Sequence, residues 1–315
     1  MSTLPVESAF DLPARPQEQR WLVTDLWSAD AVGIVGGEPK CCKSFLALDL
    51  AVAVASGTPA LRRFSVPRPG RVLLYAAEDA LHVVRQRLEG ICNAANISLR
   101  DLDVQVITAP TLRLDVPADR NRLDATVAAL TPRLLVLDPF VRLHRIDENA
   151  SGDVAPLLAY LRELQRRHGL AVLLVHHAKK GGGRIRAGQA LRGSSEFHAW
   201  GDSNLYLRRE GAKLALTVEH RAEASAPAVA LELVQRDDAL ALEVLEPAPC
   251  TTPAPSSVDE RITAALLTAQ QPLPIAELRE ICRVRNATLY QRLTALTNAG
   301  LLLRSSDGYR LATNG

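Results

Sequence analysis

The residues most capable of chemistry lie between Val32 and Ser44. An apolar run enters a short loop, and the loop ends in Lys43-Ser44 at the start of a second apolar run. The spacing of Gly37, Lys43 and Ser44 matches the phosphate-binding loop G-x-x-x-x-G-K-[ST], but Cys42 replaces its second glycine. Such a loop binds phosphate through backbone N–H groups and a helix N-terminus, its lysine adds charge, and its hydroxyl ligates Mg²⁺. We therefore predict a site for ATP and Mg²⁺.

Three other apolar runs end in side chains that suit phosphoryl transfer. Ligands of open α/β sheets bind outside the carboxyl ends of the strands, so these ends should meet at one edge. Asp138 follows Leu-Leu-Val-Leu and fits the carboxylate of the Mg²⁺ shell. Because Pro139 follows it, the base that polarises water must come from elsewhere, and Glu78 is the best candidate. His177 could detect the γ-phosphate, with His176 as the alternative.

Apolar strand-like runs alternate with helical runs along the first part of the chain. The predicted strands are 32–35, 72–76, 104–107, 134–137 and 170–175, and the helices between them are about 44–56, 79–95, 119–130 and 153–168. This order predicts an α/β fold with a mostly parallel sheet covered on both faces. After Gly201, four alternating segments predict an antiparallel extension at one edge of the sheet; they are 203–208, 213–219, 229–234 and 240–245.

The chain is expected to hold four regions. These are an irregular N-terminal arm at 1–30, an ATPase domain at 31–246, a proline-rich linker at 247–257 and a small domain at 258–315. The small domain shows helical patterns at 258–269, 274–282 and 286–299 and then a hairpin signal, which together predict a winged helix-turn-helix. Arg292 in its third helix could contact duplex DNA, although many such domains bind proteins instead.

Composition narrows the class of protein. Hydrophobic residues make up 47%, charged residues 23%, and the net charge is +2, which is typical of a globular chain and not of a polyelectrolyte. Five cysteines lack zinc-site spacing, and the N-terminus lacks the pattern of a signal peptide. The apolar run Phe45–Ala55 is too short to span a bilayer. We expect a cytoplasmic protein with reduced thiols and no membrane partner.

The motifs together resemble the RecA-fold ATPases of the AAA family, and most closely the RepA-type hexameric replicative helicases of plasmids. The resemblance spans about residues 30–235 and rests on Gly37–Leu48, Ala77-Glu78-Asp79, Leu137-Asp138, Asp147–Gly152, Val175–Lys179 and Leu191–Ser195. It implies a P-loop core in which Glu78 is the catalytic base, Asp138 holds Mg²⁺ with Ser44, and His177 senses the γ-phosphate. The residues implied to bind ATP are Gly37, Glu38, Pro39, Lys40, Cys41, Cys42, Lys43, Ser44 and Phe45.

The resemblance also implies a ring, a hexamer in such enzymes, in which a neighbouring subunit supplies an arginine to each ATP site. Arg221 is the first choice because it follows the predicted strand 213–219, and Arg192 and Arg208 are its rivals. A basic, glycine-rich segment, 178–192, begins directly after the histidines. Its charges would suit single-stranded DNA in a central channel, although an ordinary surface loop is the alternative; they are Lys179, Lys180, Arg184 and Arg186.

Cys42 is the departure from the loop pattern. A cysteine there costs little if the residue has a negative φ at the start of the helix. A thiol beside Lys43 and a helix N-terminus is expected to have a lowered pKa. We therefore expect ATP turnover that is sensitive to oxidation or alkylation of Cys41 or Cys42.

The function that combines these features is an ATP-driven DNA translocase or helicase, acting as a ring in replication of a plasmid or other mobile element. The alternative is an ATP-gated regulator that assembles on DNA without unwinding it. A non-catalytic scaffold with a decayed loop is a third hypothesis, and the retention of Lys43, Ser44, Glu78 and Asp138 speaks against it.

Overall fold

The computed structural model describes most of the chain, in two compact units. The described residues are 4–12, 16, 19–148, 150–177, 196–211, 213–221, 227–236, 239–245, 257–269, 271–282, 284, 286–305 and 307–312. The first unit is Met1–Glu246 and the second is Pro247–Gly315. Among the described residues, no helix has the length and apolar character needed to cross a membrane.

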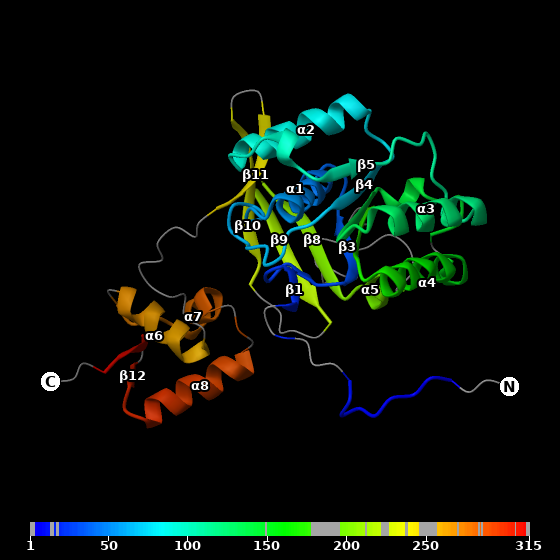
Figure 1. Ribbon diagram of the computed structural model, residues 1–315. Coiled ribbons are helices and arrows are strands. Elements are labelled where there is room, and N and C mark those ends of the chain that lie inside the picture. Colours follow the sequence, from blue (N-terminus) through cyan, green and yellow to red (C-terminus); the bar gives the residue numbers. More distant parts are fainter. Residues whose placement is uncertain are drawn as a thin grey trace. The chain divides into compact units, whose positions relative to one another are not determined.

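A nine-stranded sheet forms the centre of the first unit (Figure 1). Its strand order is β11-β10-β9-β8-β3-β7-β6-β4-β5. Six strands run parallel: β3 (Val32–Gly37), β4 (Val72–Ala76), β5 (Val104–Val106), β6 (Leu134–Asp138), β7 (Ala171–His177) and β8 (Ser203–Glu210). Three continue it in antiparallel pairing: β9 (Lys213–His220), β10 (Val229–Arg236) and β11 (Ala239–Val244). The predicted antiparallel extension is confirmed, but its first strand, β8, itself pairs in parallel with β3.

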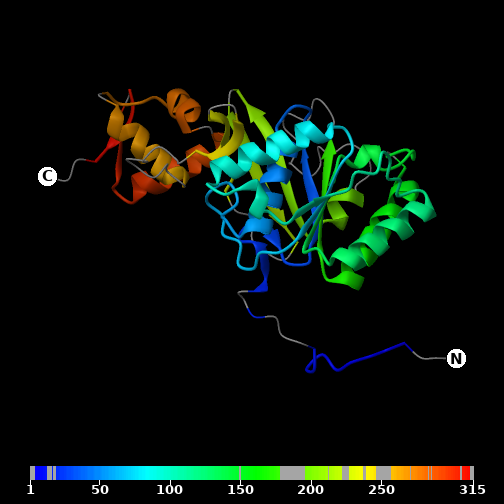
Figure 2. The same ribbon diagram turned by 45° about the horizontal axis from the view of Figure 1, so that its top comes forward.

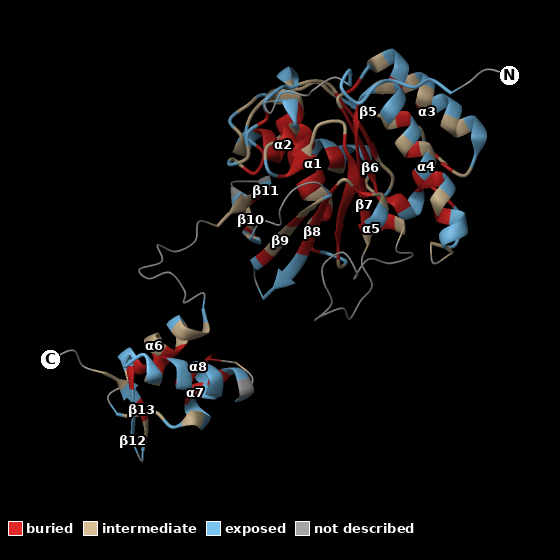
Figure 3. Ribbon diagram, turned by 90° about the horizontal axis from the view of Figure 1, so that it is seen from below, coloured by how far each residue is buried: buried red, intermediate tan, exposed pale blue. Residues whose placement is uncertain are grey.

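Helices cover both faces of this sheet, as the apolar strands require (Figures 1 and 2). One face packs against α1 (Lys43–Ser56) and α2 (Leu81–Ala94). The other packs against α3 (Pro117–Leu130), α4 (Ser151–His168) and the short α5 (Glu196–Trp200). Successive strand residues alternate between the two cores, and Figure 3 shows the buried residues gathered on the strands and on the inner sides of the helices.

A small hairpin precedes β3 where the sequence predicted an irregular arm. It consists of β1 (Trp21–Val23) and β2 (Trp27–Ser28) in antiparallel pairing. Its apolar side chains are buried in the core that contains α1, and they are Leu22, Val23, Leu26 and Trp27. The prediction of an irregular arm up to residue 30 is therefore wrong for residues 21–28, because a strand of two or three residues leaves too little periodicity to detect.

The described residues of the second unit form three helices and a hairpin. Their bounds are α6 (Val258–Thr268), α7 (Ile275–Cys282), α8 (Asn286–Asn298), β12 (Leu302–Ser305) and β13 (Gly308–Leu311). Ser257 and Glu260 form a capping box at the start of α6. The buried apolar residues of the three helices share one small core with Leu302 and Tyr309 of the hairpin. The predicted order of helices and hairpin is present in the structure.

Candidate functional site

The loop of residues 38–42 joins strand β3 to helix α1 at the carboxyl edge of the parallel strands. β3 is buried along its whole length between β7 and β8. Gly37 has φ +152°, and a β-carbon there would overlap the carbonyl oxygen of Leu207 and lie 2.7 Å from Cys41 Sγ. Glycine is therefore required at position 37, because the backbone of β8 and the sulfur of Cys41 leave no room for a side chain.

The start of α1 offers donors to an anion. The helix begins at Lys43, has no acidic residue in its first turn, and receives no side-chain capping hydrogen bond from Cys42. The first backbone N–H groups of a helix have no acceptor within the helix, and they lie at the positive end of its dipole. The residues present thus fit a phosphate group, because a bound phosphate accepts from such amides.

Lys43 lies beneath the loop and is only 5% exposed. Its Nζ donates to the carbonyl oxygen of Glu38 at 2.7 Å and lies 3.8 Å from Cys41 Sγ. Burial lowers the pKa of Lys43, while charges on Cys41 and Asp138 oppose that change. The ammonium group is thus held among loop atoms, where a triphosphate could replace the Glu38 carbonyl as its hydrogen-bond acceptor.

Asp138 ends strand β6 beside the start of α1. Its side chain is buried and hydrogen-bonded to Ser44. Burial raises the pKa of Asp138 to about 6, and the Ser44 hydrogen bond opposes this rise. A hydroxyl and a carboxylate that already meet are oxygen ligands of the kind that Mg²⁺ takes. Ser44 and Asp138 therefore fit the magnesium role expected of them.

Glu78 lies next to this carboxylate across two neighbouring strands. Ala76 of β4 is the register partner of Asp138 in β6, and Glu78 follows two residues later. Its carboxylate is 43% exposed and its Oε1 accepts from Arg142 Nε at 2.8 Å. Arg142 belongs to a short 3-10 helix, Phe140–Arg142, that directly follows β6. The candidate base is thus near Asp138, and an arginine that sequence reasoning did not identify holds it.

A second ion pair borders the same edge. Asp79, adjacent to Glu78, is paired with Arg87 of α2. The Arg87 guanidinium also lies 5.2 Å from the ring centroid of Phe45, in the first turn of α1. The negative charges of Glu78 and Asp79 both contribute to the raised pKa of Asp138. Acidic and basic side chains from the ends of β4 and β6 and from helices α1 and α2 therefore converge beside the loop.

The two histidines at the end of β7 face opposite sides of the sheet. His176 is 1% exposed and stacks on Phe197 of α5, with ring centroids 4.2 Å apart. His177 is the register partner of Gly37 in β3, and it continues the series Ala171, Leu173 and Val175, whose side chains lie on the α1 face. His177 is therefore on the face of the loop, whereas His176 is part of the opposite core and is unsuited to the sensor role.

The arginines expected to assist hydrolysis lie in different places. Arg221 follows β9, whose last residue, His220, pairs with Ser203 at the start of β8. It is therefore at the amino edge of the parallel strands, opposite the loop, where it is ion-paired with Asp202. Its guanidinium also donates to the carbonyl of Ala199.

Strand β8 carries two arginines near the loop. Arg208 is ion-paired with Glu210 of the same strand. Arg209 donates from Nη2 to the carbonyl oxygen of Lys40 at 2.9 Å and so contacts the phosphate-loop backbone directly. Arg209 was not among the residues predicted from the sequence. It could be identified only from the pairing of β8 with β3, which makes Leu207 the partner of Gly37 and places Arg209 two residues later.

The expected DNA contacts are mostly outside the described residues. Outside the described residues lie Lys179, Lys180, Arg184 and Arg186, and also Arg192, a rival for the arginine that a neighbouring subunit supplies. Arg292 is described, and its guanidinium forms an ion pair with Asp259 of α6 through two hydrogen bonds. The guanidinium of Arg292 is therefore already bound by a residue of its own unit.

For Cys42 the condition of a negative φ is not met, and the expectation of a lowered thiol pKa is wrong. The residue has φ +63° and ψ +27°, which is left-handed, instead of the negative φ under which a cysteine would cost little. Burial also raises the pKa of both Cys41 and Cys42, and the positive charges of Lys43 and Arg209 oppose this only in part. The thiols are thus less acidic than ordinary ones, because their loss of solvent outweighs the neighbouring charges.

The fold and the site define a P-loop nucleotide-binding protein, with a mostly parallel sheet and a phosphate loop between a buried strand and a helix. The family model AAA_25, described as an AAA domain, matches residues 2–183, more than half of the 315 residues. The chain belongs to this family of AAA-type ATPases. The match includes the phosphate loop, Glu78, Asp138 and both histidines of β7.

Proposed function

We propose that this protein is an ATP-hydrolysing DNA translocase or helicase of the RepA-like type, which acts as a ring, a hexamer in our proposal, in replication of a plasmid or other mobile element. The observation that carries the proposal is the convergence of Lys43, Ser44, Asp138 and Glu78 at the carboxyl edge of the sheet. These are the charge and oxygen groups that phosphoryl transfer to water requires. Membership of an AAA-type ATPase family supports the same chemistry.

The roles follow from the positions of the side chains. Lys43 and the first amides of α1 would bind the phosphates, and Ser44 and Asp138 would hold Mg²⁺, which supplies charge neutralisation when bound. Glu78 would orient the attacking water and accept its proton, and for this its carboxylate must separate from Arg142. His177, on the loop face of β7, is the residue best placed to respond to the loss of phosphate.

Coupling to DNA is supported by chain order. β7 ends at His177, and the basic glycine-rich segment 178–192 begins at the next residue. Because the segment follows β7 without a break in the chain, a displacement of His177 at the end of β7 would also displace the start of the segment. In the proposal, its arginines and lysines bind the phosphates of single-stranded DNA.

Assembly is part of the proposal because each described arginine beside the loop already has a partner within the chain; they are Arg87, Arg142, Arg208 and Arg209. Arg221 lies at the opposite end of the sheet from its own loop, so it could act only on the site of another subunit. We keep Arg221 as the candidate for the arginine that a neighbouring subunit supplies, and Arg208 and Arg192 as its rivals.

The second unit is proposed to be a winged helix-turn-helix that binds duplex DNA. Support comes from its three helices followed by the hairpin β12–β13, an arrangement typical of that class. Because Arg292 is paired with Asp259, any contact of Arg292 with DNA would compete with this ion pair.

Unwinding of a forked DNA duplex tests the proposal against its alternative. Wild type with ATP should separate the strands, and Lys43→Ala should not. Lys213→Ala is the matched control, because Lys213 is an exposed lysine of β9 with no role in the site. ATP hydrolysis without unwinding would favour the DNA-binding regulator, and absence of hydrolysis by wild type would overturn both.

A further inference from the structure

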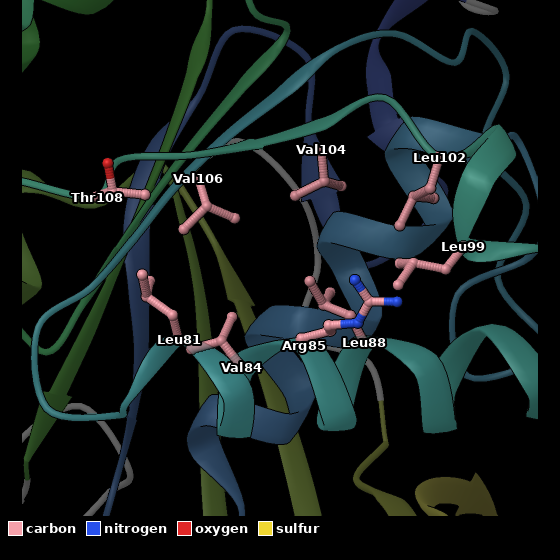
Figure 4. A pocket seen from close by; sticks show the side chains of 9 residues that line it. All are labelled: Leu81, Val84, Arg85, Leu88, Leu99, Leu102, Val104, Val106 and Thr108. Atoms are coloured by element: carbon pink, nitrogen blue, oxygen red, sulfur yellow. The ribbon is translucent and has the colours of Figure 1, made fainter.

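An apolar pocket of about 310 Å³ lies at the β5 end of the sheet, and none of its lining residues belongs to the phosphate loop (Figure 4). Helix α2 supplies one wall, through Leu81, Val84 and Leu88. Val104 and Val106 of β5 supply the facing wall. Figure 4 shows these side chains pointing toward one another across the hollow, with the Arg85 guanidinium beside them.

The strand that forms one wall is also an open edge. β5 pairs with β4 and is the last strand in the sheet order, so no described strand covers its outer side. Asp103 accepts from Val72, and Ile107 donates to Leu74, so the backbone groups of these alternate residues face β4. Those of Val104 and Val106 consequently face outward. An exposed strand edge beside an apolar pocket accepts an extended segment, because backbone pairing and alternate side chains are satisfied together.

A segment of matching pattern is found near the N-terminus. Residues 4–12 read Leu-Pro-Val-Glu-Ser-Ala-Phe-Asp-Leu, with large apolar side chains at even positions only. Leu4, Val6, Phe10 and Leu12 are 85%, 88%, 94% and 56% exposed. Such a period of two gives an extended strand one apolar face. Four large apolar side chains exposed together on a short segment indicate a surface that is covered by a partner.

The odd positions add a complementary charge and a compatible backbone. Glu7 and Asp11 give the segment two negative charges. Arg85 stands at the pocket, where it is ion-paired with Glu89, and docking would let an acid of the segment share this guanidinium. Pro5 has no N–H to donate, which is tolerated on an edge strand if that position faces outward. With the even positions paired to β5, Pro5 does face outward.

We propose that residues 4–12 of one copy of this chain add to strand β5 of a second copy, with apolar side chains of the even positions in the α2–β5 pocket. The turn now formed by the hydrogen bond from Asp11 N to Ser8 O at 3.0 Å would open on docking. This inference rests on the proposed assembly into a ring, but it needs no ATP turnover.

The topology favours the pocket of a second copy over that of the same chain. The hairpin β1–β2 contacts β8 through the hydrogen bond from Ser28 N to Ser203 Oγ at 3.0 Å. β5 is five strand positions from β8, which is roughly 24 Å at about 4.8 Å per strand. The nine residues from Leu12 to Trp21 span at most about 31 Å when fully extended, so reaching the pocket of the same chain would use about three quarters of that length and leave little slack.

Peptide binding tests the pocket directly and without ATP. A fluorescent peptide of residues 4–12 is titrated into the full chain carrying Phe10→Asp and Val6→Asp, which keeps the pocket but disables its own arm. We expect saturable binding that Leu81→Glu weakens roughly tenfold or more, the change expected for losing one buried apolar contact. Leu81 is 52% exposed, so this variant should fold. A peptide of the same composition in scrambled order is the control, and equal binding of both would overturn the proposal.

Mixing experiments distinguish docking between copies from docking within one chain. The arm variant (Phe10→Asp with Val6→Asp) and the pocket variant Leu81→Glu are each analysed by light scattering, alone and mixed. If docking joins two copies, each variant alone has a smaller mass than wild type, and the mixture forms dimers through one intact contact. A mass equal to wild type for both variants, or no dimer in the mixture, would contradict docking between copies. Because none of these measurements uses ATP, they can fail or succeed independently of the proposed ATPase function.

Discussion

Replacing Cys42 by glycine tests how the phosphate loop accommodates its unusual residue. Cys42 has φ +63°, and the left-handed region costs a residue with a β-carbon about 1–2 kcal/mol, which glycine does not incur. Glycine also gives the unfolded chain more freedom, which offsets about 0.4–1 kcal/mol of that gain. The sulfur of Cys42 is half-buried against the core, so its contacts are lost in the variant. Cys42→Ala loses the sulfur but keeps the β-carbon, and it is therefore the reference for Cys42→Gly.

We expect Cys42→Gly to be more stable than Cys42→Ala by about 0.5–1 kcal/mol, the net of these two effects. For a unit of this size that is a difference of roughly 1–4 °C in melting temperature. Urea unfolding followed by circular dichroism gives the free energies, and calorimetry gives the melting temperatures. A glycine variant equal to or less stable than the alanine variant would show that the left-handed backbone at position 42 is not strained, and would refute this reasoning.

Four further predictions concern single side chains. Glu78→Gln should lower ATP hydrolysis by about 10²- to 10⁴-fold with little change in ATP affinity, because it removes a general base; an affinity that falls equally would contradict that role. Arg142→Ala should raise hydrolysis measured without DNA, because it removes the ion pair that holds Glu78, and an unchanged or lower rate would count against it. Arg209→Ala should raise the KM for ATP, because the hydrogen bond to the Lys40 carbonyl is lost, whereas Arg208→Ala should not; equal effects would show a general charge effect. Burial lowers the pKa of His220 below 6.5, so the unfolded chain binds more protons and the free energy of unfolding should fall as the pH drops below about 6.5. His220→Asn should reduce that slope in denaturation at pH 5–7, and an unchanged slope would exclude His220 as its source.

The regular elements could be predicted because their signals are local. Strand β6 reads Leu-Leu-Val-Leu, and its continuous apolar run identifies a strand buried on both faces. The period of two also separates His176 from His177, since neighbouring residues of a strand face opposite cores. Position after such strands predicted Asp138 and Glu78, which the structure brings to neighbouring strand ends.

The features that could not be predicted depend on contacts between distant residues. Arg142 and Arg209 contact the site only because β6 and β8 are placed beside β4 and β3. The left-handed backbone of Cys42 has no sequence signal, since a cysteine in place of glycine suggests a negative φ. The thiol pKa was predicted from neighbouring charge, but burial depends on how the loop packs and proved the larger effect.

Steady-state ATP hydrolysis with and without single-stranded DNA tests most directly whether this site is a working ATPase that acts on DNA. We expect wild type to hydrolyse ATP faster when DNA is present, Lys213→Ala to behave like wild type, and Lys43→Ala to lose hydrolysis under both conditions. Hydrolysis that persists in Lys43→Ala, or wild-type hydrolysis that does not respond to DNA, would contradict the proposed function.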